Sequence, residues 1–245
     1  MTSVSPADLA ATELCPGVRV VFTTRAGGVS SGRYGSLNLG LSVGDEEPAV
    51  LANRESLIGA FDGGPARVSW ISQVHGAEVT RSPSAAGTEA DAHFTDVSGV
   101  ALGVLVADCA PVLLADPVAR VAGAAHAGRP GLARGVVPAL IAAMAGAGAD
   151  PSRMRALIGP SVCGRCYEVP GELRDEVEAA APGSACVTSK GTPGIDIRAG
   201  LRRQLAAAGV AVVADDQRCT VESAEFYSYR RDGTTGRFAG LVWLA

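Results

Sequence analysis

Residues 105–128 read LVADCAPVLLADPVARVAGAAHAG, a stretch that is apolar except for a few isolated polar side chains. Its apolar segments, bounded by turn residues, predict three strands over 100–107, 111–115 and 120–126. The connections between these strands are only a few residues long, too short for the helical crossover that parallel neighbours require. The stretch therefore predicts an antiparallel meander at the centre of the protein.

Other apolar and Val-rich segments predict strands over 18–24, 67–74, 154–159 and 210–214. The clearest helical pattern runs over 196–209, where Asp196 can accept the first free amides and Gly209 suits a left-handed stop. Two more helices are predicted over 130–146 and 171–181. Because helices alternate with strands around a meander, we expect an α/β protein of the α+β type. Its mixed sheets would form an α/β/β/α layered arrangement within one domain, residues 1–245.

The composition limits the class of protein. With 245 residues and 47% hydrophobic content, the chain can bury a substantial core. A formal charge of −4 argues against nucleic-acid binding, which needs clustered excess Lys and Arg. The first residues lack a basic region followed by an apolar one, and the longest apolar stretch is shorter than the roughly 20 residues that span a bilayer. We expect a cytoplasmic protein without membrane contact, with its six cysteines reduced. The sequence does not indicate an oligomeric state.

Three potential metal ligands stand at the ends of predicted strands: His75, Cys109 and His126. Two imidazoles and one thiolate suit Zn²⁺, and three protein ligands leave a fourth position for water or substrate, as in catalytic zinc sites. Spacing alone leaves open that each is simply a buried core residue. A competing pair, Cys163 and Cys166, forms a single CxxC, which without a second pair nearby in sequence favours a structural or incidental role.

The chain resembles a bacterial family of multicopper polyphenol oxidase (laccase)-like proteins, also described as purine nucleoside phosphorylases and as peptidoglycan editing factors. The resemblance rests on ordered motifs over nearly the whole chain: TTRAGGVS at 23–30, LNLG at 37–40, NR at 53–54, QVHG at 73–76, ADA at 90–92, ADC at 107–109, AHAG at 125–128, IGP at 158–160, CYEV at 166–169 and SYRRDG at 228–233. It implies that His75, Cys109 and His126 bind zinc. The chain departs from the family at His93, which we expect to be peripheral, and at Cys163, so a CxxC metal site is not inherited.

The resemblance implies a zinc-dependent purine nucleoside enzyme. Such an enzyme would cleave adenosine, inosine or methylthioadenosine with phosphate and would deaminate adenosine, with nucleoside and phosphate as its small-molecule partners. Zinc suits deamination because it lowers the pKa of bound water from ~15.7 towards ~7. Asp108 could serve as a general base if the chain bends towards the cleft there, and is otherwise a turn residue that supports the ligands.

Phosphorolysis also needs an anion pocket. Arg25, in a Gly-rich turn, could hold phosphate as a bidentate fork, or could be a solvated loop arginine. Backbone amides from Gly128 to Gly131, which open a predicted helix, could add dipolar support. Arg231 lies in the YRRDG stretch, which could form the rim of a cleft or a salt-bridged turn.

Three alternatives remain. Three histidines cannot supply the ligands of a four-copper oxidase, although one copper at the His-Cys-His site could give weak polyphenol oxidase activity. Cys109 and His126 could instead act as nucleophile and base of an amidase that edits peptidoglycan precursors. A non-enzymatic zinc protein would close the site with a fourth protein ligand, such as Cys163 or His93.

Overall fold

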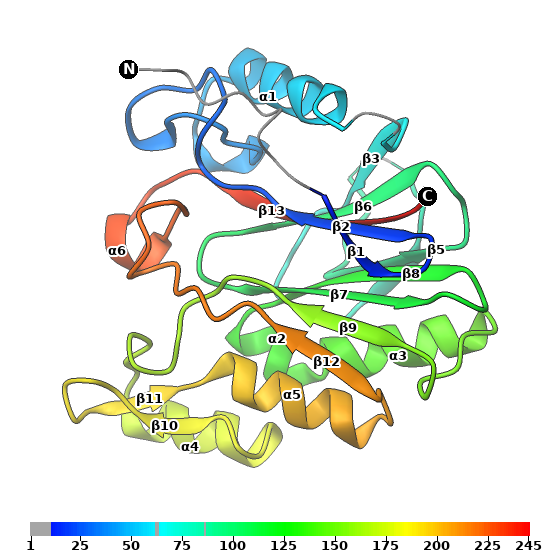
Figure 1. Ribbon diagram of the computed structural model, residues 1–245. Coiled ribbons are helices and arrows are strands. Elements are labelled where there is room, and N and C mark those ends of the chain that lie inside the picture. The colour runs from blue at the N-terminus through cyan, green and yellow to red at the C-terminus, as the bar shows by residue number, and fades with distance from the viewer. Residues whose placement is uncertain (1–10, 62–63, 86) are drawn as a thin grey trace.

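Two β-sheets lie face to face at the centre of the structure, a computed structural model that describes residues 11–61, 64–85 and 87–245 (Figure 1). The five-stranded sheet has the order β1 (Thr12–Cys15), β2 (Val18–Phe22), β13 (Phe238–Leu244), β6 (Val100–Val106) and β3 (Arg67–Trp70). The six-stranded sheet has the order β12 (Val212–Asp215), β9 (Arg155–Ile158), β7 (Ala110–Asp116), β8 (Val121–Ala127), β5 (Ala92–Thr95) and β4 (Val79–Arg81). Both sheets mix parallel and antiparallel pairs, as predicted.

Helices cover the outer faces of both sheets (Figure 1). Helix α1 (Glu47–Gly59) packs its buried Leu57 with residues of the five-stranded sheet such as Leu241. The other side is covered by α2 (Arg129–Arg134), α3 (Val136–Gly146), α4 (Gly171–Ala180) and α5 (Ile197–Ala207). A short ribbon of β10 (Ala185–Val187) and β11 (Pro193–Ile195) lies beside α4, and α6 (Tyr229–Asp232) precedes β13. The predicted single α/β domain with α/β/β/α layers is confirmed.

The predicted meander is only partly correct. Strands β7 and β8 form the antiparallel hairpin, from Ala110 opposite Ala127 to Asp116 opposite Val121. Strand β6, however, pairs with β13 and β3 in the other sheet. The chain changes sheets where Asp108 has a φ of 99°, a left-handed backbone that redirects it. Strands β6 and β7 therefore pack face to face across the core between the sheets, where a meander would have paired them edge to edge.

The predicted helix over 130–146 is two helices. Gly135 has a φ of 75° and ends α2 in a left-handed conformation, which glycine adopts at little cost. The predicted helix over 196–209 is confirmed as α5: the carboxylate of Asp196 accepts the amide of Ala199 at 2.9 Å, and Gly209 has a φ of 83°. Helix α4 confirms the prediction over 171–181.

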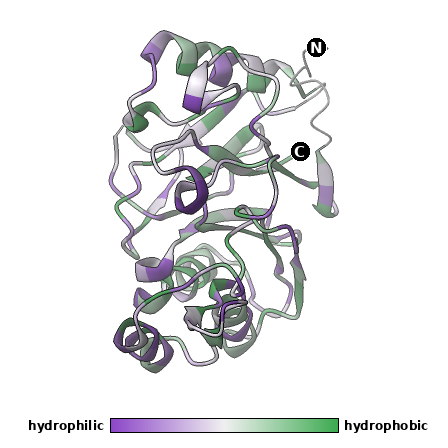
Figure 2. Ribbon diagram, turned by 90° about the vertical axis from the view of Figure 1, so that its left-hand side faces the viewer, coloured by the Kyte–Doolittle hydropathy of each residue, from purple (hydrophilic) through white to green (hydrophobic). Residues whose placement is uncertain are grey.

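Figure 2 shows hydrophilic residues along the outer helices and loops, with hydrophobic segments concentrated in the sheets between them. Within the part of the chain that the structure describes, none of the helices combines the length and apolar character needed to cross a bilayer. Residues 1–10, where the sequence shows no secretion-signal pattern, lie outside the described residues.

Candidate metal centre and cavity

His75, Cys109 and His126 come together from three separate segments of the chain. His75 lies in the loop after β3, Cys109 lies between β6 and β7, and His126 lies near the end of β8. Cys109 Sγ is 3.8 Å from His75 Nε2, and one donor atom from each of the three residues lies within 4.8 Å of the others. His126 is buried, Cys109 is half-buried and His75 is exposed. This group, called here the His–Cys–His cluster, has the nitrogen and sulfur donors that zinc prefers and an exposed side.

Asp91 organises the His–Cys–His cluster. Its Oδ1 lies 2.8 Å from Nδ1 of His126, and both side chains are buried. The same carboxylate accepts the backbone amides of Val74, His75 and Gly76 at 3.1, 2.9 and 2.6 Å. Because a carboxylate only accepts hydrogen bonds, Nδ1 of His126 carries the proton and Nε2 is left as the donor to a metal.

The loop that carries His75 has an unusual backbone, and Asp91 holds it. His75 has a φ of 59°, in the left-handed region that residues other than glycine adopt at a cost. Burial raises the pKa of Asp91, but hydrogen bonds from His126 and Gly76 outweigh burial and hold the pKa below its usual range. Asp91 was not among the predicted site residues. The sequence feature that could have identified it is its place in the ADA motif at 90–92.

Cys109 and His126 shift each other's pKa in opposite directions. Burial alone raises the pKa of the Cys109 thiol, but the charge of His126 and hydrogen bonds from His126 and His75 lower it to about 6. Burial lowers the pKa of His126, but the Cys109 thiolate and the bond to Asp91 raise it to about 9. These shifts favour the thiolate of Cys109 at neutral pH, the form that binds metals and attacks electrophiles.

This pairing predicts the pH dependence of Cys109 alkylation. In chelator-treated protein, the rate of Cys109 alkylation by iodoacetamide should rise with pH through a midpoint near 6, because the thiolate fraction grows as pH passes the lowered pKa. Peptide mass mapping at each pH measures the rate. Cys15 is the internal control, since burial raises the pKa of its thiol and its alkylation should need higher pH. A midpoint for Cys109 near the ordinary thiol value of about 8.5 would show that no such pair exists.

Gly128 is needed for the close packing of the cluster. A Cβ at this position would lie 2.8 Å from Cys109 Sγ and 3.0 Å from His75 Cδ2. Its φ of −78° is ordinary, so the requirement is for space. Gly128 was predicted to help bind phosphate through backbone amides at the start of one helix over 130–146. In the structure Gly128 instead precedes the short helix α2. We therefore assign this glycine a steric role.

We predict that Gly128→Ala weakens zinc binding by about 10-fold to 100-fold, the size of effect seen when groups that position metal ligands are changed. Zinc competition with a chromophoric chelator measures the affinity. Gly146→Ala is the matched control, because a Cβ at Gly146 meets nothing within 4 Å. Equal affinities in the two variants would contradict the steric role.

The cluster opens onto a cavity of about 980 Å³, within the size range of small-molecule sites. Four arginines line it: Arg54, Arg129, Arg230 and Arg237. Three aromatic side chains also line it: Trp70, Tyr167 and Tyr229. The guanidinium of Arg54 lies 4.6 Å from the ring centroid of Trp70, and that of Arg230 lies 4.7 Å from that of Tyr167. The cavity therefore offers positive charge and stacking surfaces next to the candidate metal ligands.

Asp108 lines the same cavity as Cys109, because its left-handed backbone breaks the alternation of side chains along a strand. Its Oδ1 accepts the hydroxyl of Thr220 at 2.6 Å, and its Oδ2 accepts the amide of Arg230 at 2.7 Å. Asp108 thus links the ligand-bearing turn to the loop of Thr220 and to helix α6. Each oxygen retains a further lone pair.

The structure does not bring Arg25 and Arg231 to the cavity wall. Nε of Arg25 donates to the carbonyl of Gly35 at 2.9 Å, and its guanidinium lies 4.9 Å from the ring centroid of Tyr227. The guanidinium of Arg231 donates to backbone carbonyls, including that of Thr220 at 2.7 Å, and pairs with Asp232. The neighbouring Arg230 lines the cavity instead. Sequence spacing could not distinguish these adjacent arginines.

The two residues considered for closing the metal site lie elsewhere. His93 is fully buried, with Nδ1 3.0 Å from Ser82 Oγ, and burial lowers its pKa to about 3. Cys163 belongs to a separate group of side chains. Among the residues that the structure describes, the His–Cys–His cluster thus holds three candidate ligands, which leaves room for a fourth from solvent or substrate.

Comparison with known proteins shows relatives that match nearly the whole chain. The family model described as multi-copper polyphenol oxidoreductase laccase matches residues 19–245. A purine nucleoside phosphorylase of Streptomyces griseus is 55% identical over 228 residues, covering 91% of this chain and 93% of the relative. One of Streptomyces coelicolor is 54% identical over 232 residues, covering 93% and 96%. Protein NMB0706 of Neisseria meningitidis has a similar solved structure, with a TM-score of 0.87, 40% identity and coverage of 96% and 98%. YlmD of Geobacillus stearothermophilus has a TM-score of 0.85, 33% identity and coverage of 95% and 94%.

Proposed function

The chain belongs to the multi-copper polyphenol oxidoreductase laccase family, and from that premise we propose that it is a zinc-dependent purine nucleoside phosphorylase that also deaminates adenosine. The relatives named purine nucleoside phosphorylase support the reaction class. The observation that carries the proposal is the convergence of His75, Cys109 and His126 on a cavity lined by arginines. Adenosine, inosine and methylthioadenosine are the proposed nucleosides.

His75, Cys109 and His126 would hold the zinc, and their donor types fit it. A bound zinc supplies a Lewis acid and activates water at neutral pH. Asp91 fixes the ring of His126 and the His75 loop, so that the donors stay aligned without substrate. A four-copper oxidase is disfavoured, because it needs many imidazoles and the chain has three histidines, of which His93 is buried beside Ser82.

Phosphorolysis breaks the bond between ribose C1′ and the purine nitrogen and forms a bond between C1′ and a phosphate oxygen. We assign phosphate binding to the cavity arginines Arg129, Arg230 and Arg237, in place of Arg25 and Arg231. Tyr167 and Trp70 offer stacking surfaces for the purine. In deamination, Asp108 would accept a proton from the attacking water through a free lone pair.

Product analysis tests the reaction. Zinc-loaded protein is incubated with adenosine, with and without phosphate, and the products are identified by mass. Adenine with ribose 1-phosphate, formed only when phosphate is present, is expected for phosphorolysis, and inosine for deamination. Inosine and methylthioadenosine are then compared under the same conditions. If none of the three nucleosides changes, the proposal fails.

The thiolate–imidazolium pair of Cys109 and His126 favours a second candidate, a metal-free Cys–His amidase acting on a peptidoglycan precursor. In that reaction Cys109 attacks the amide carbonyl and forms a thioester as the C–N bond breaks, His126 protonates the departing amine, and water then hydrolyses the thioester to release the acid and restore the thiol. Chelator separates the two candidates. Full activity after zinc removal would favour the amidase, whereas activity that returns only with added zinc would favour the metalloenzyme.

A further inference from the structure

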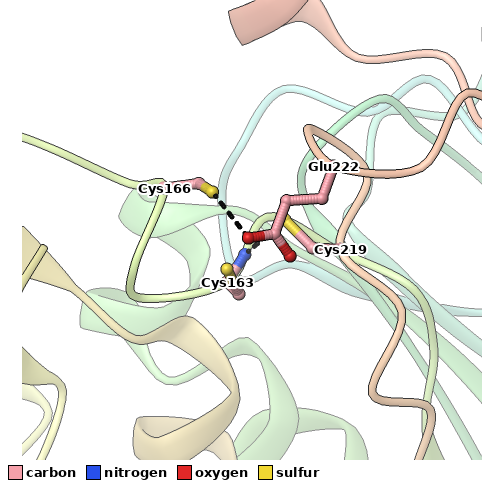
Figure 3. A group of neighbouring side chains, drawn as sticks. All are labelled: Cys163, Cys166, Cys219 and Glu222. Atoms are coloured by element: carbon pink, nitrogen blue, oxygen red, sulfur yellow. Dashed lines mark hydrogen bonds between the residues drawn. The ribbon is translucent and has the colours of Figure 1, made fainter. Parts of the chain in front are cut away.

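A second group of donor side chains lies outside the cavity. Cys163 and Cys166 come from the loop between β9 and α4, and Cys219 and Glu222 come from the loop between β12 and α6 (Figure 3). One ligand atom from each of the four lies within 4.8 Å of the others. The CxxC pair appeared isolated in the sequence. The fold supplies a second pair with the same spacing, Cys219-x-x-Glu222, which gives what is called here the Cys₃Glu cluster.

Backbone hydrogen bonds build a tight turn at each pair. The amides of Cys166 and Tyr167 donate to the carbonyl of Cys163 at 2.9 and 3.0 Å, and the amide of Ser223 donates to that of Cys219 at 2.8 Å. A parallel β-bridge between Ser161 and Cys219 fastens the two loops together. The C-x₂-C spacing is typical of tetrahedral zinc sites, and the second turn supplies Cys219 and Glu222 at the same spacing.

The side chains of the Cys₃Glu cluster contact one another, and nearby N–H groups donate hydrogen bonds to two of them. Cys163 and Cys219 are buried, the Cys163 amide donates to Cys219 Sγ at 3.4 Å, and the Cys166 thiol lies 3.6 Å from Glu222 Oε1 (Figure 3). Arg165 donates to both oxygens of Glu222 at 3.1 and 3.2 Å. Three thiolates and a carboxylate would leave a site with one zinc ion negatively charged, and Arg165 offsets part of that charge.

We propose that Cys163, Cys166, Cys219 and Glu222 bind a zinc ion in a structural site that is closed by four protein ligands and shares no donor with the His–Cys–His cluster. Three sulfurs and one carboxylate form a complete tetrahedral set. The ion joins two loops that also serve the cavity. One loop carries Tyr167 of the cavity wall, and the other carries Thr220, which binds Asp108.

Zinc content in a background without Cys109 tests the proposal independently of the nucleoside reaction. The Cys109→Ala variant, purified with zinc and passed through a desalting column, is expected to retain one zinc per chain, and Cys109→Ala/Cys219→Ser none. The matched control is Cys109→Ala/Cys186→Ser, which should retain one zinc. The Cys186 thiol donates to the Gly164 carbonyl at 3.4 Å beside the cluster but is not one of its four donors.

A second measurement does not depend on the folding of the double variants. In zinc-loaded Cys109→Ala protein, the thiols of Cys163, Cys166 and Cys219 should be protected from alkylation, and chelator should expose all three, as mapped by peptide mass. Cobalt substitution should give a sulfur-to-metal charge-transfer band that Cys219→Ser weakens and Cys186→Ser preserves. The proposal is overturned by Cys109→Ala protein that holds no zinc, by one zinc retained in Cys109→Ala/Cys219→Ser protein, or by a disulfide among the three cysteines.

Discussion

The Cys109→Ala variant is expected to lose zinc from the His–Cys–His cluster and to turn over purine nucleosides about 10³-fold more slowly, or worse. Removing the thiolate leaves two imidazoles, of which His75 is exposed. A metal contributes several kcal/mol of charge stabilisation in such reactions, and each 1.36 kcal/mol is a factor of ten in rate. Steady-state kinetics with adenosine and phosphate, together with zinc analysis, measure both losses.

The control for Cys109→Ala is Cys186→Ala, a half-buried cysteine outside the cavity, which should leave both properties unchanged. Unchanged nucleoside turnover in Cys109→Ala would contradict the assignment of the site. Lost turnover with zinc still bound at His75 and His126 would point to a thiolate nucleophile, as in the amidase candidate.

The Asp91→Ala variant is expected to lower the free energy of unfolding by about 3–5 kcal/mol, as when one partner of a buried charged pair is removed. His126 and the three amides at 74–76 would lose their common acceptor. Zinc affinity should fall by about 10-fold to 100-fold, because His126 is no longer oriented. Chemical denaturation of zinc-free protein and zinc competition measure the two effects separately.

Asp96→Ala is the control for Asp91→Ala, since Asp96 is an exposed carboxylate that pairs with Arg81 at the surface and should matter little. Asp91→Asn should recover part of the stability, because an amide oxygen still accepts hydrogen bonds from the loop. Stability of Asp91→Ala equal to that of Asp96→Ala would show that Asp91 does not organise the site.

Local patterns predicted much of the fold. Helix α5 follows from its Asp196 cap and Gly209 stop, and the β7–β8 hairpin follows from its short connection. The placement of β6 in the other sheet could not be predicted, because β6 and, up to its last residue Asp116, β7 are apolar and fit either side of the core. Helix α1 was not predicted, because its buried face includes the polar Asn53, which interrupts the apolar pattern. The side chain of Asn53 donates to the Asn38 carbonyl at 2.9 Å.

The candidate metal ligands could be predicted because their side chains stand at the ends of predicted strands. His75, Cys109 and His126 were selected on that basis, and the structure brings them together. Convergence of residues distant in sequence was not predictable from spacing. For this reason the contact of Asp91 with His126 and the approach of Cys219 to the CxxC pair emerge only from the fold.

Anomalous diffraction at the zinc edge, from crystals of the zinc-loaded protein, tests the metal assignment most directly. A peak is expected at about 2.0–2.3 Å from His75 Nε2, Cys109 Sγ and His126 Nε2, with one coordination position facing the cavity. No peak at these three atoms in zinc-saturated crystals would contradict the zinc-dependent mechanism, whatever metal is found at the Cys₃Glu cluster.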